Sequence, residues 1–181
     1  MTEHTYEIHR SESQATSNLL WIGGRVGVGL AYRDYFELRE DGSLAWQAAI
    51  HWESSCSLFQ SQLVWEEANA ALFGAHDEVY ALDIRTGAVI LHRTLESYFG
   101  YFELAPFHRM AIVLTGTGIL AFDSDLQEMW SSHHVAVDGI VCKEIGQQFL
   151  TVDAEMDPPG GWQRVTIDLK TGKEVSRIPC P

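Results

Sequence analysis

The sequence predicts an all-β fold of about four four-stranded antiparallel sheets, and three observations lead to this prediction. From Leu19 onward, short apolar runs alternate with Gly, Asp, Asn or Ser. Similar turn sequences recur, with Asp83, Asp123 and Asp168 separated by 40 and 45 residues. The composition, 46% hydrophobic and 20% charged, is that of a globular chain that can bury a core.

Residues 78–90 contain the clearest copy of the repeated unit. Residues 79–83 are β-branched, aromatic or apolar and predict a strand, and residues 88–91 predict a second one. Between them, Arg85-Thr86-Gly87 predicts a tight turn. Related turns occur at residues 40–42, 123–125 and 170–172. We therefore interpret Asp83, Thr86 and Gly87 as residues that shape a turn rather than contact a substrate.

The repeats divide the chain into four segments, residues 18–50, 57–95, 98–132 and 135–178, within a single domain of residues 18–181. Each segment divides into about four strands, the number found in one blade of a β-propeller. Residues 1–17 are interpreted as a flexible arm or an extra edge strand. The expected strands are 19–22, 25–31, 35–39 and 44–48; 57–65, 70–74, 79–84 and 88–94; 98–104, 110–115, 119–123 and 126–131; and 135–143, 147–153, 162–169 and 174–178.

Residues 63–73 allow two interpretations. The segment is rich in helix formers and places Trp65, Ala68 and Leu72 on one helical face, which favours a short helix. The repeat, however, requires a strand on each side, and Asn69 suits a turn. We predict a hairpin with its turn at residues 66–69.

Three segments carry a resemblance to a known family. Residues 80–89 (YALDIRTGAV), 120–130 (LAFDSDLQEMW) and 166–175 (TIDLKTGKEV) resemble the A-x-D-x-x-T-G-x-x-x-W repeat of quinoprotein-type (PQQ-like) β-propellers, and more broadly WD40-like propeller repeats. The similarity covers residues 35–178 and implies the fold. The final Trp of the pattern is present only as Trp130 and, in the first copy, Trp46.

The resemblance does not extend to the quinone site. Quinone-dependent dehydrogenases of that family close a ring of eight blades, hold calcium with acidic and amide side chains, and often carry adjacent cysteines. Four repeats without a Cys-Cys pair do not make such a site, so we expect no cofactor. Four blades could close a small ring alone, or a second copy could complete an eight-bladed ring as a homodimer.

The overall charge limits the classes of partner. Twelve Lys and Arg against 25 Asp and Glu give a formal net charge of −13. Such a field repels nucleic-acid phosphates and anionic lipid, and it attracts basic proteins. No apolar run is long enough to cross a membrane, and residues 1–18 lack the pattern of a secretion signal. The odd set Cys56, Cys142 and Cys180 fits reduced thiols, so we expect a cytoplasmic protein.

One acidic segment is the main candidate for a binding site. Asp153, Glu155 and Asp157 are spaced two apart, which places them on one side of a strand if the strand continues. The segment resembles the start of a calcium loop, but Pro158 stands where that loop requires Gly, which disfavours metal binding. Trp162 follows a Pro-Pro-Gly-Gly connection and could either anchor a basic partner or pack between blades.

Other polar groups favour structural roles. His133 and His134 are candidates for partner binding, but neighbouring residues on a strand face opposite ways and cannot both bind one metal ion. A Gly116-Thr-Gly118 segment matches a dinucleotide-binding pattern, yet a strand follows it instead of the required helix. Cys56 lies near His51 without the elbow sequence of a nucleophile, so we expect no catalytic residue.

These observations favour a non-catalytic module that binds or scaffolds proteins. A strongly acidic chain suits a basic partner, for example a toxic nuclease that it neutralises as an immunity protein. The alternative is a small-molecule or sugar binder, or a minor hydrolase, with a pocket at the propeller mouth lined by Trp, His and carboxylates. Tryptophans exposed in a concave mouth would favour that alternative, whereas tryptophans buried between blades would favour a scaffold.

Overall fold

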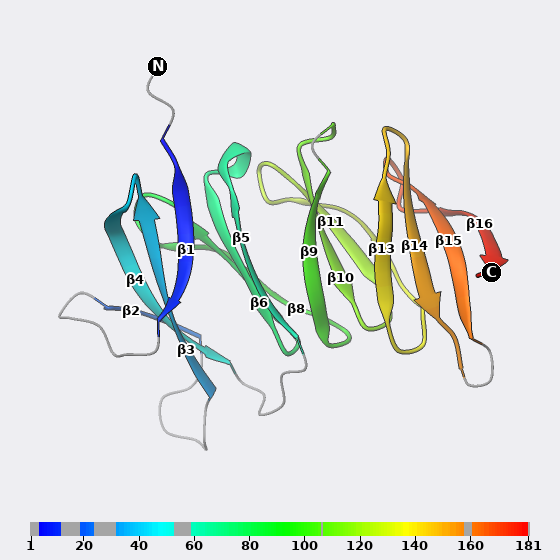
Figure 1. The fold of residues 1–181 in the computed structure, drawn as a ribbon, viewed down its shortest axis with the longest axis horizontal. Helices are drawn as coiled ribbons and strands as arrows, with labels where there is room; N and C mark the ends of the chain where they lie inside the picture. The colour runs from blue at the N-terminus through cyan, green and yellow to red at the C-terminus, as the bar shows by residue number, and fades with distance from the viewer. Residues whose placement is uncertain are drawn as a thin grey trace. The chain divides into compact units, whose positions relative to one another are not determined.

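The computed structural model describes residues 4–11, 19–23, 32–52, 59–105, 107–157 and 161–180. The chain forms two compact units, Met1–Thr94 and Leu95–Pro181. Each unit contains two four-stranded sheets (Figure 1). Among the described residues, the helical element is the single 3₁₀ turn Glu66–Ala68, and no helix is long and apolar enough to span a membrane. The predicted all-β class with four four-stranded sheets is confirmed.

The first unit holds two sheets whose strand orders differ. The first sheet has the order β1-β3-β4-β2, and the second has the sequential order β5-β6-β7-β8. The strands are β1 Tyr6–Ser11, β2 Leu19–Ile22, β3 Tyr32–Glu40, β4 Ser43–Trp52, β5 Gln60–Trp65, β6 Ala70–Ala75, β7 Glu78–Asp83 and β8 Val89–Thr94.

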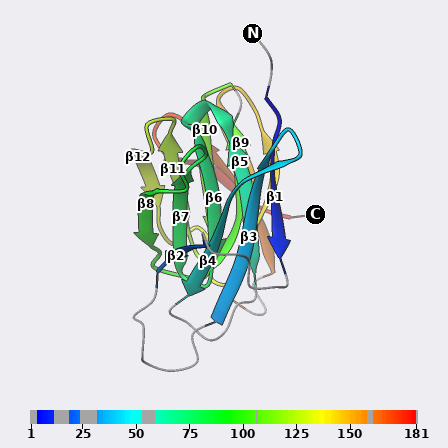
Figure 2. The same ribbon diagram turned by 90° about the vertical axis from the view of Figure 1, so that its left-hand side faces the viewer.

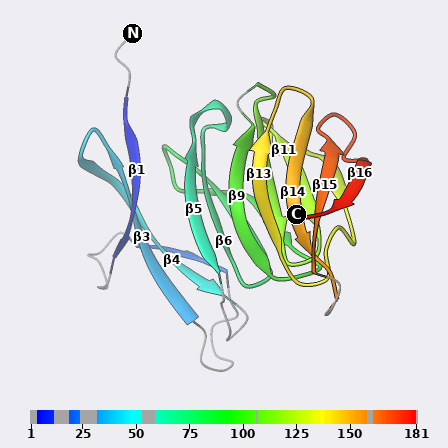
Figure 3. The same cartoon turned by 45° about the vertical axis from the view of Figure 1, so that its right-hand side comes forward.

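The second unit holds two sequential sheets. Their orders are β9 to β12 and β13 to β16, and Figure 3 shows the latter sheet with β16 in red at its edge. The strands are β9 Phe99–Ala105, β10 Met110–Thr115, β11 Ile119–Asp123, β12 Glu128–Ser132, β13 Ile140–Ile145, β14 Phe149–Glu155, β15 Trp162–Asp168 and β16 Glu174–Pro179.

Strand bounds lie within three residues of the prediction, except at the end of β4, at the start of β13 and in the composition of the first sheet. β10 and β11 begin and end where the sequence predicted. In the last repeat, the first strand begins at Ile140 and not at residue 135. The reason is that the backbone N–H groups of Val135 and Ala136 both donate to the Thr117 carbonyl, which holds this segment against another turn.

The first sheet differs from the prediction in how its strands pair. β1 is an edge strand paired antiparallel with β3, as Figure 2 shows, and β2 pairs with β4 in parallel. The expectation that every strand is antiparallel is therefore wrong for β2. The strand predicted at residues 25–31 lies outside the described residues.

The hairpin predicted at residues 63–73 is confirmed. β5 and β6 pair antiparallel, and Glu66–Ala68 forms the connecting turn. Asn69 closes the turn with a φ of 50°, a left-handed conformation that Asn adopts more readily than most residues. Its side-chain Nδ2 donates to Asp83 Oδ2 at 2.6 Å. The helix formers in this segment are overridden because both flanking strands gain a full set of ladder hydrogen bonds.

The repeated Asp-Thr-Gly turns use the same local hydrogen bonds. Asp83 Oδ1 accepts from the N–H of Arg85 at 3.0 Å and from the N–H and hydroxyl of Thr86, both at 2.8 Å. Asp168 Oδ1 makes the equivalent bonds with Lys170 and Thr171. A carboxylate that accepts three donors replaces the hydrogen bonds that the chain loses on reversing direction.

Within each unit, a tryptophan from one sheet packs on the turn of the next. Trp46 Nε1 donates to the Ile84 carbonyl at 2.7 Å, and Trp130 Nε1 donates to the Leu169 carbonyl at 2.7 Å. Both tryptophans are 7% exposed. Each indole thereby buries a large apolar area while its N–H keeps a partner.

Burial differs between individual strands. Every residue of β6 and of β10 is buried, so both faces of these strands are shielded from solvent. β14 alternates buried Leu150, Val152 and Ala154 with partly exposed residues. The fourth sheet consequently has one face in the core of its unit and one polar face carrying Asp153 and Glu155.

Candidate functional site

Two of the predicted binding residues, Glu155 and Trp162, gather at one place with Asp138; we name this place the acidic corner and define it as Asp138, Glu155 and Trp162. Glu155 ends β14 and Trp162 begins β15, where the two residues are directly paired. A Cβ placed on Gly139 would lie 3.3 Å from Glu155 Oε2 and 3.7 Å from Trp162 Cη2. The carboxylate and the indole therefore both flank Gly139, and Trp162 remains 40% exposed.

The loop that precedes β13 is fixed to the end of β14 by backbone hydrogen bonds. Val137 N–H donates to the Glu155 carbonyl at 2.8 Å, and Glu155 N–H donates to the Gly139 carbonyl at 2.9 Å. Across the base of the following connection, Met156 N–H donates to the Gly161 carbonyl at 2.9 Å. These bonds hold Trp162 and Glu155 on a rigid support.

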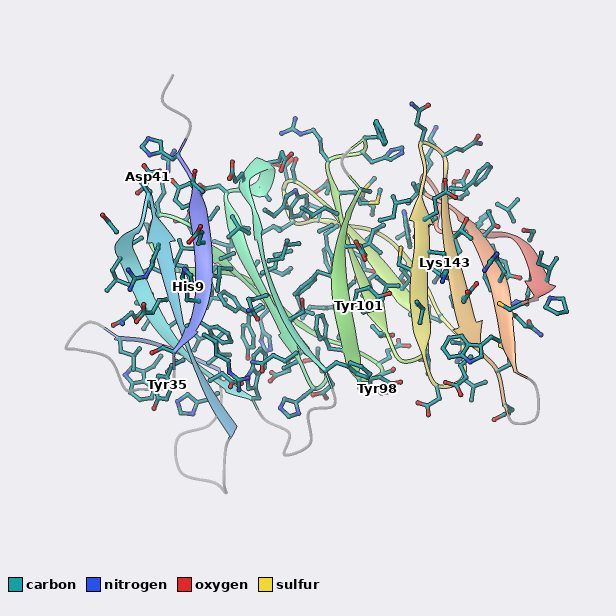
Figure 4. All side chains as sticks on the ribbon, in the orientation of Figure 1. His9, Tyr35, Asp41, Tyr98, Tyr101 and Lys143 are labelled. Carbon is teal, nitrogen blue, oxygen red and sulfur yellow. The ribbon has the colours of Figure 1, made fainter. Side chains whose placement is uncertain are left out.

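Tyr98 extends the acidic corner. Its hydroxyl donates to Asp138 Oδ1 at 3.0 Å, and Figure 4 shows Tyr98 beside β9. Burial, the hydrogen bond to Asp138 and the nearby negative charges of Asp138 and Glu155 raise the pKa of Tyr98 to about 12. The phenol therefore stays neutral at physiological pH and donates to Asp138.

Asp153 forms an ion pair and is not part of the acidic corner. Arg164 Nε and Nη2 donate to its two oxygens at 2.9 and 3.2 Å, and Lys143 Nζ lies 3.8 Å from Oδ2. Lys143 is labelled in Figure 4. The hydrogen bonds from Arg164 lower the pKa of Asp153. Asp153 and Glu155 share one face of β14 as predicted, whereas Asp157 lies beyond the end of that strand and is exposed.

The two histidines lie outside any strand, because β12 ends at Ser132. His133 Nδ1 lies 2.9 Å from Glu96 Oε2, and its Nε2 lies 3.1 Å from the Ser131 hydroxyl. His134 is exposed and has a φ of 57°. The contacts recorded for His133 thus join it to Glu96 and Ser131, not to Asp153, Glu155 or Trp162.

The acidic corner combines negative charge with an aromatic surface. A Lys or Arg placed over an exposed indole is attracted to its ring, and neighbouring carboxylates strengthen that attraction. Among the described residues, no group of three or more His, Cys, Asp and Glu is arranged to hold a metal ion. The Gly116 to Gly118 segment forms the hairpin turn between β10 and β11, with Thr115 N–H donating to the Gly118 carbonyl at 2.9 Å.

Sequence reasoning missed Asp138, Gly139 and Tyr98. Tyr98 and Asp138 are 40 residues apart, so no local pattern connects them. Gly139 carried one usable signal, because a glycine placed just before a strand often marks a close approach of another group. Here the group is the pair Glu155 and Trp162.

No protein-family model matches the sequence, and no curated protein matches it. Solved structures are similar. BamB from Moraxella catarrhalis matches 96% of this chain and 51% of its own, with 16% identity and a TM-score of 0.57. The chain has a β-propeller-like fold.

Two further structures support this assignment of the fold. Hydrazine synthase of Kuenenia stuttgartiensis matches 86% of this chain and 52% of its own, with 11% identity and a TM-score of 0.58. The Pan2 WD40 domain of Neurospora crassa matches 84% of this chain and 50% of its own, with 13% identity and a TM-score of 0.50. The chain thus spans about half the length of each of these three solved chains.

Proposed function

We propose that this chain is a non-catalytic module that binds a protein with a basic surface through the acidic corner. The observation that carries the proposal is the exposed indole of Trp162 beside the Glu155 carboxylate, both held by backbone hydrogen bonds. Exposed aromatic residues on rigid supports are common anchors of protein interfaces. An indole with adjacent acids suits a Lys or Arg side chain of the partner.

The charge of the whole chain supports the same class of partner. A net charge of −13 attracts a basic protein over distances longer than direct contact and speeds its approach. We propose the cytoplasm as the compartment because the cysteine count is odd, and a basic toxic effector such as a nuclease as the type of partner. In that role, the acidic corner would cover basic residues that the effector needs for its own target.

The burial of the tryptophans favours this function over a small-molecule or sugar site. Four of the six, Trp46, Trp52, Trp65 and Trp130, are 7% exposed or less. The two exposed ones, Trp21 and Trp162, belong to different compact units. Tryptophans buried in the cores of the units act as a scaffold and are not available to stack on a ligand.

Self-association is a second part of the proposal. The chain spans about half of the solved propellers that it resembles, so two copies would supply a full-length ring. A contact through the outer face of the fourth sheet would involve Asp153, Arg164 and Lys143. Because that face is polar, we expect such a homodimer to weaken as salt increases.

The test is binding of the purified chain to its co-purified basic partner at about 50 mM and about 500 mM salt, since surface charges are largely screened at the higher value. We expect capture at low salt and a marked loss at high salt. A Trp162→Ala, Glu155→Gln double variant is the specificity control and should capture less partner at both concentrations. If the amount of captured partner changes neither with the salt concentration nor in the double variant, the proposal is contradicted.

A further inference from the structure

Three polar side chains of the unit Leu95–Pro181, those of Ser131, His133 and Glu96, contact one another in a row. Ser131 Oγ lies 3.1 Å from His133 Nε2, and His133 Nδ1 lies 2.9 Å from Glu96 Oε2. The hydroxyl and the carboxylate therefore contact opposite nitrogens of one imidazole. The acidic corner includes none of these residues.

The hairpin turn between β10 and β11 anchors the two chain segments that carry this group. Gly116 N–H donates to the Tyr98 carbonyl at 2.8 Å, just after the glutamate in the chain. The Thr117 carbonyl accepts from the Val135 N–H at 2.8 Å, just after the histidine. The glutamate and the histidine are remote in the sequence, yet their backbones are fixed to adjacent residues of one turn.

The third sheet holds Ser131. This residue lies on β12, the end strand of the order β9 to β12 (Figure 2), where it pairs with Leu120 of β11. Residues two apart on an extended chain point to the same side, and His133 follows just beyond the end of β12. The spacing of two residues thus brings the imidazole to the hydroxyl. The His133 side chain is 50% exposed, so small molecules in solution have access to it.

This arrangement contains the parts of an activated nucleophile, which are a hydroxyl, a base within hydrogen-bond reach and a third group that orients the base. The Glu96 carboxylate beside Nδ1 favours the imidazole tautomer with its proton on Nδ1, because that proton is attracted to the negative charge. Nε2 then has a lone pair, and the Ser131 hydroxyl donates to it. Ser131 therefore differs from a serine whose hydroxyl has no base beside it.

We propose that Ser131 is a modification site that accepts an acyl group from a thioester. Ser131 Oγ attacks the carbonyl carbon of the thioester, a C–O bond forms and the C–S bond breaks. His133 Nε2 takes the hydroxyl proton and passes it to the departing thiolate. The products are an ester on Ser131 and a free thiol, so the step needs no further reactant.

The exposure of the group selects the class of acyl donor. The Glu96 side chain is 78% exposed, so the site does not exclude water from the reacting atoms. A donor that reacts at such a site must carry its own good leaving group. A thiolate meets this condition, because thiols are far more acidic than alcohols or amines. The inference goes beyond the proposed binding function and does not rest on it.

The probe is the acetyl thioester of N-acetylcysteamine, incubated with the full chain. Trypsin then releases residues 110–143 as one peptide, which contains Ser131 and no internal Lys or Arg. We expect one acetyl group, assigned to Ser131 by fragmentation and removed by hydroxylamine, which cleaves esters but leaves acetylated amines intact. Ser124, in the turn after β11, lies in the same peptide and is the internal comparison. It should react about 100-fold more slowly, because a positioned general base contributes at least about that factor.

Variants test each member of the group. His133→Asn should slow acetylation of Ser131 by about 100-fold, since the base is removed. His134→Asn, at the exposed neighbouring position, is the matched control and should leave the rate unchanged. Glu96→Gln should slow the reaction by a smaller factor, because the base remains but loses the group that orients it. The midpoint of urea denaturation should stay unchanged in Glu96→Gln, which separates a positioning role from a structural one.

The outcomes separate this inference from the proposed function. Equal rates at Ser131 and Ser124 in the wild-type chain would overturn the inference without the use of any variant. An unchanged rate in His133→Asn would also overturn it, because exposure alone would then explain the labelling. If the wild-type chain releases thiol repeatedly and Ser131→Ala does not, the activation of Ser131 is supported and the non-catalytic function proposed above is wrong. If Ser131 is not labelled but the basic partner is captured in a Trp162-dependent manner, only the modification site is wrong.

Discussion

Trp130 covers Gly172 so closely that a Cβ on the glycine would lie 2.6 Å from Trp130 Cε3. Trp46 likewise lies against Gly87, where a Cβ would lie 3.2 Å from Trp46 Cδ2 and nearer still to Leu20 Cδ1. Gly172 and Gly87 have φ values of 68° and 69°, which also favour glycine. Two features of the repeated turn therefore favour glycine. Its backbone angle φ is positive, and the neighbouring indole leaves little room for a Cβ.

Gly172→Ala should lower the free energy of unfolding by about 2 to 4 kcal/mol, from backbone strain together with displacement of the indole. Chemical denaturation followed by tryptophan fluorescence measures this change. Gly42→Ala is the control, because Gly42 has a φ of 77° but nothing lies within 4 Å of its Cβ position. We expect it to lose only about 1 kcal/mol. Equal losses for both variants would show that the indole adds nothing to the requirement for glycine.

Asp168→Ala should destabilise the last turn, because Asp168 Oδ1 accepts three hydrogen bonds from Lys170 and Thr171. We expect a loss of about 1 to 2 kcal/mol, since the turn is exposed and water replaces part of each bond. The measurement is equilibrium denaturation in urea. Asp157→Ala, which removes an exposed carboxylate outside such a turn, should change stability by less than about 0.5 kcal/mol.

Asp153 should give the chain a pH-dependent contribution to stability. Its pKa is lowered in the folded chain, chiefly by the hydrogen bonds from Arg164. The stabilisation is therefore complete above the unfolded pKa of about 3.9 and is lost as pH falls through the lower folded value. Asp153→Asn should cost less than about 1 kcal/mol at pH 7, because Arg164 is partly exposed, and progressively less as the pH falls below about 3.9.

Denaturation curves of the wild-type and Asp153→Asn chains at pH 7, 4 and 2 test this expectation. Asp157→Asn is the matched control, since Asp157 is exposed and lies beyond the end of β14. A difference between wild type and Asp153→Asn that persists unchanged to pH 2 would show that the ion pair with Arg164 is not its source.

Cys142 should react slowly with thiol reagents. Burial, followed by the nearby charge of Glu103, raises its pKa to about 11. The Cys142 N–H also donates to the Tyr101 hydroxyl at 2.5 Å, and Figure 4 labels Tyr101. At pH 8 the thiolate fraction should be about 100-fold lower than for a thiol with the reference value of 9, and alkylation correspondingly slower.

Mass spectrometry of iodoacetamide-treated chain, digested at timed intervals, measures the alkylation rate of Cys142. The same reaction in guanidinium chloride supplies the unfolded rate as a control. Rates that are equal in the folded and unfolded chains would rule out protection of Cys142 by burial.

Trp162→Ala should weaken binding to the basic partner by about 10-fold while changing the free energy of unfolding by less than about 1 kcal/mol, because an exposed anchor contributes more to an interface than to folding. Calorimetric titration and denaturation measure the two effects. Trp21→Ala is the matched control: Trp21 is 58% exposed and lies in the other unit, so its loss should leave affinity unchanged.

The candidate site was only partly accessible to sequence reasoning. The spacing of Asp153 and Glu155 correctly placed both on one face of β14. Their different roles depend on partners remote in the sequence: Arg164 neutralises Asp153, whereas Glu155 lies beside Trp162 over Gly139. Alternation along a strand specifies a face, but it does not specify which charges from neighbouring strands meet there.

The sequence by itself determined the strands of the last three sheets, the hairpin at Asn69 and the Asp-Thr-Gly turns, because hydrogen bonds within a few residues and two-residue alternation encode them locally. Only the tertiary structure decided that β2 joins β4 in parallel, that β1 pairs with β3, and that Trp130 packs on Gly172. These features bring together segments separated by tens of residues. Their free energy comes from burial and from ladder hydrogen bonds between remote strands, so no local pattern contains them.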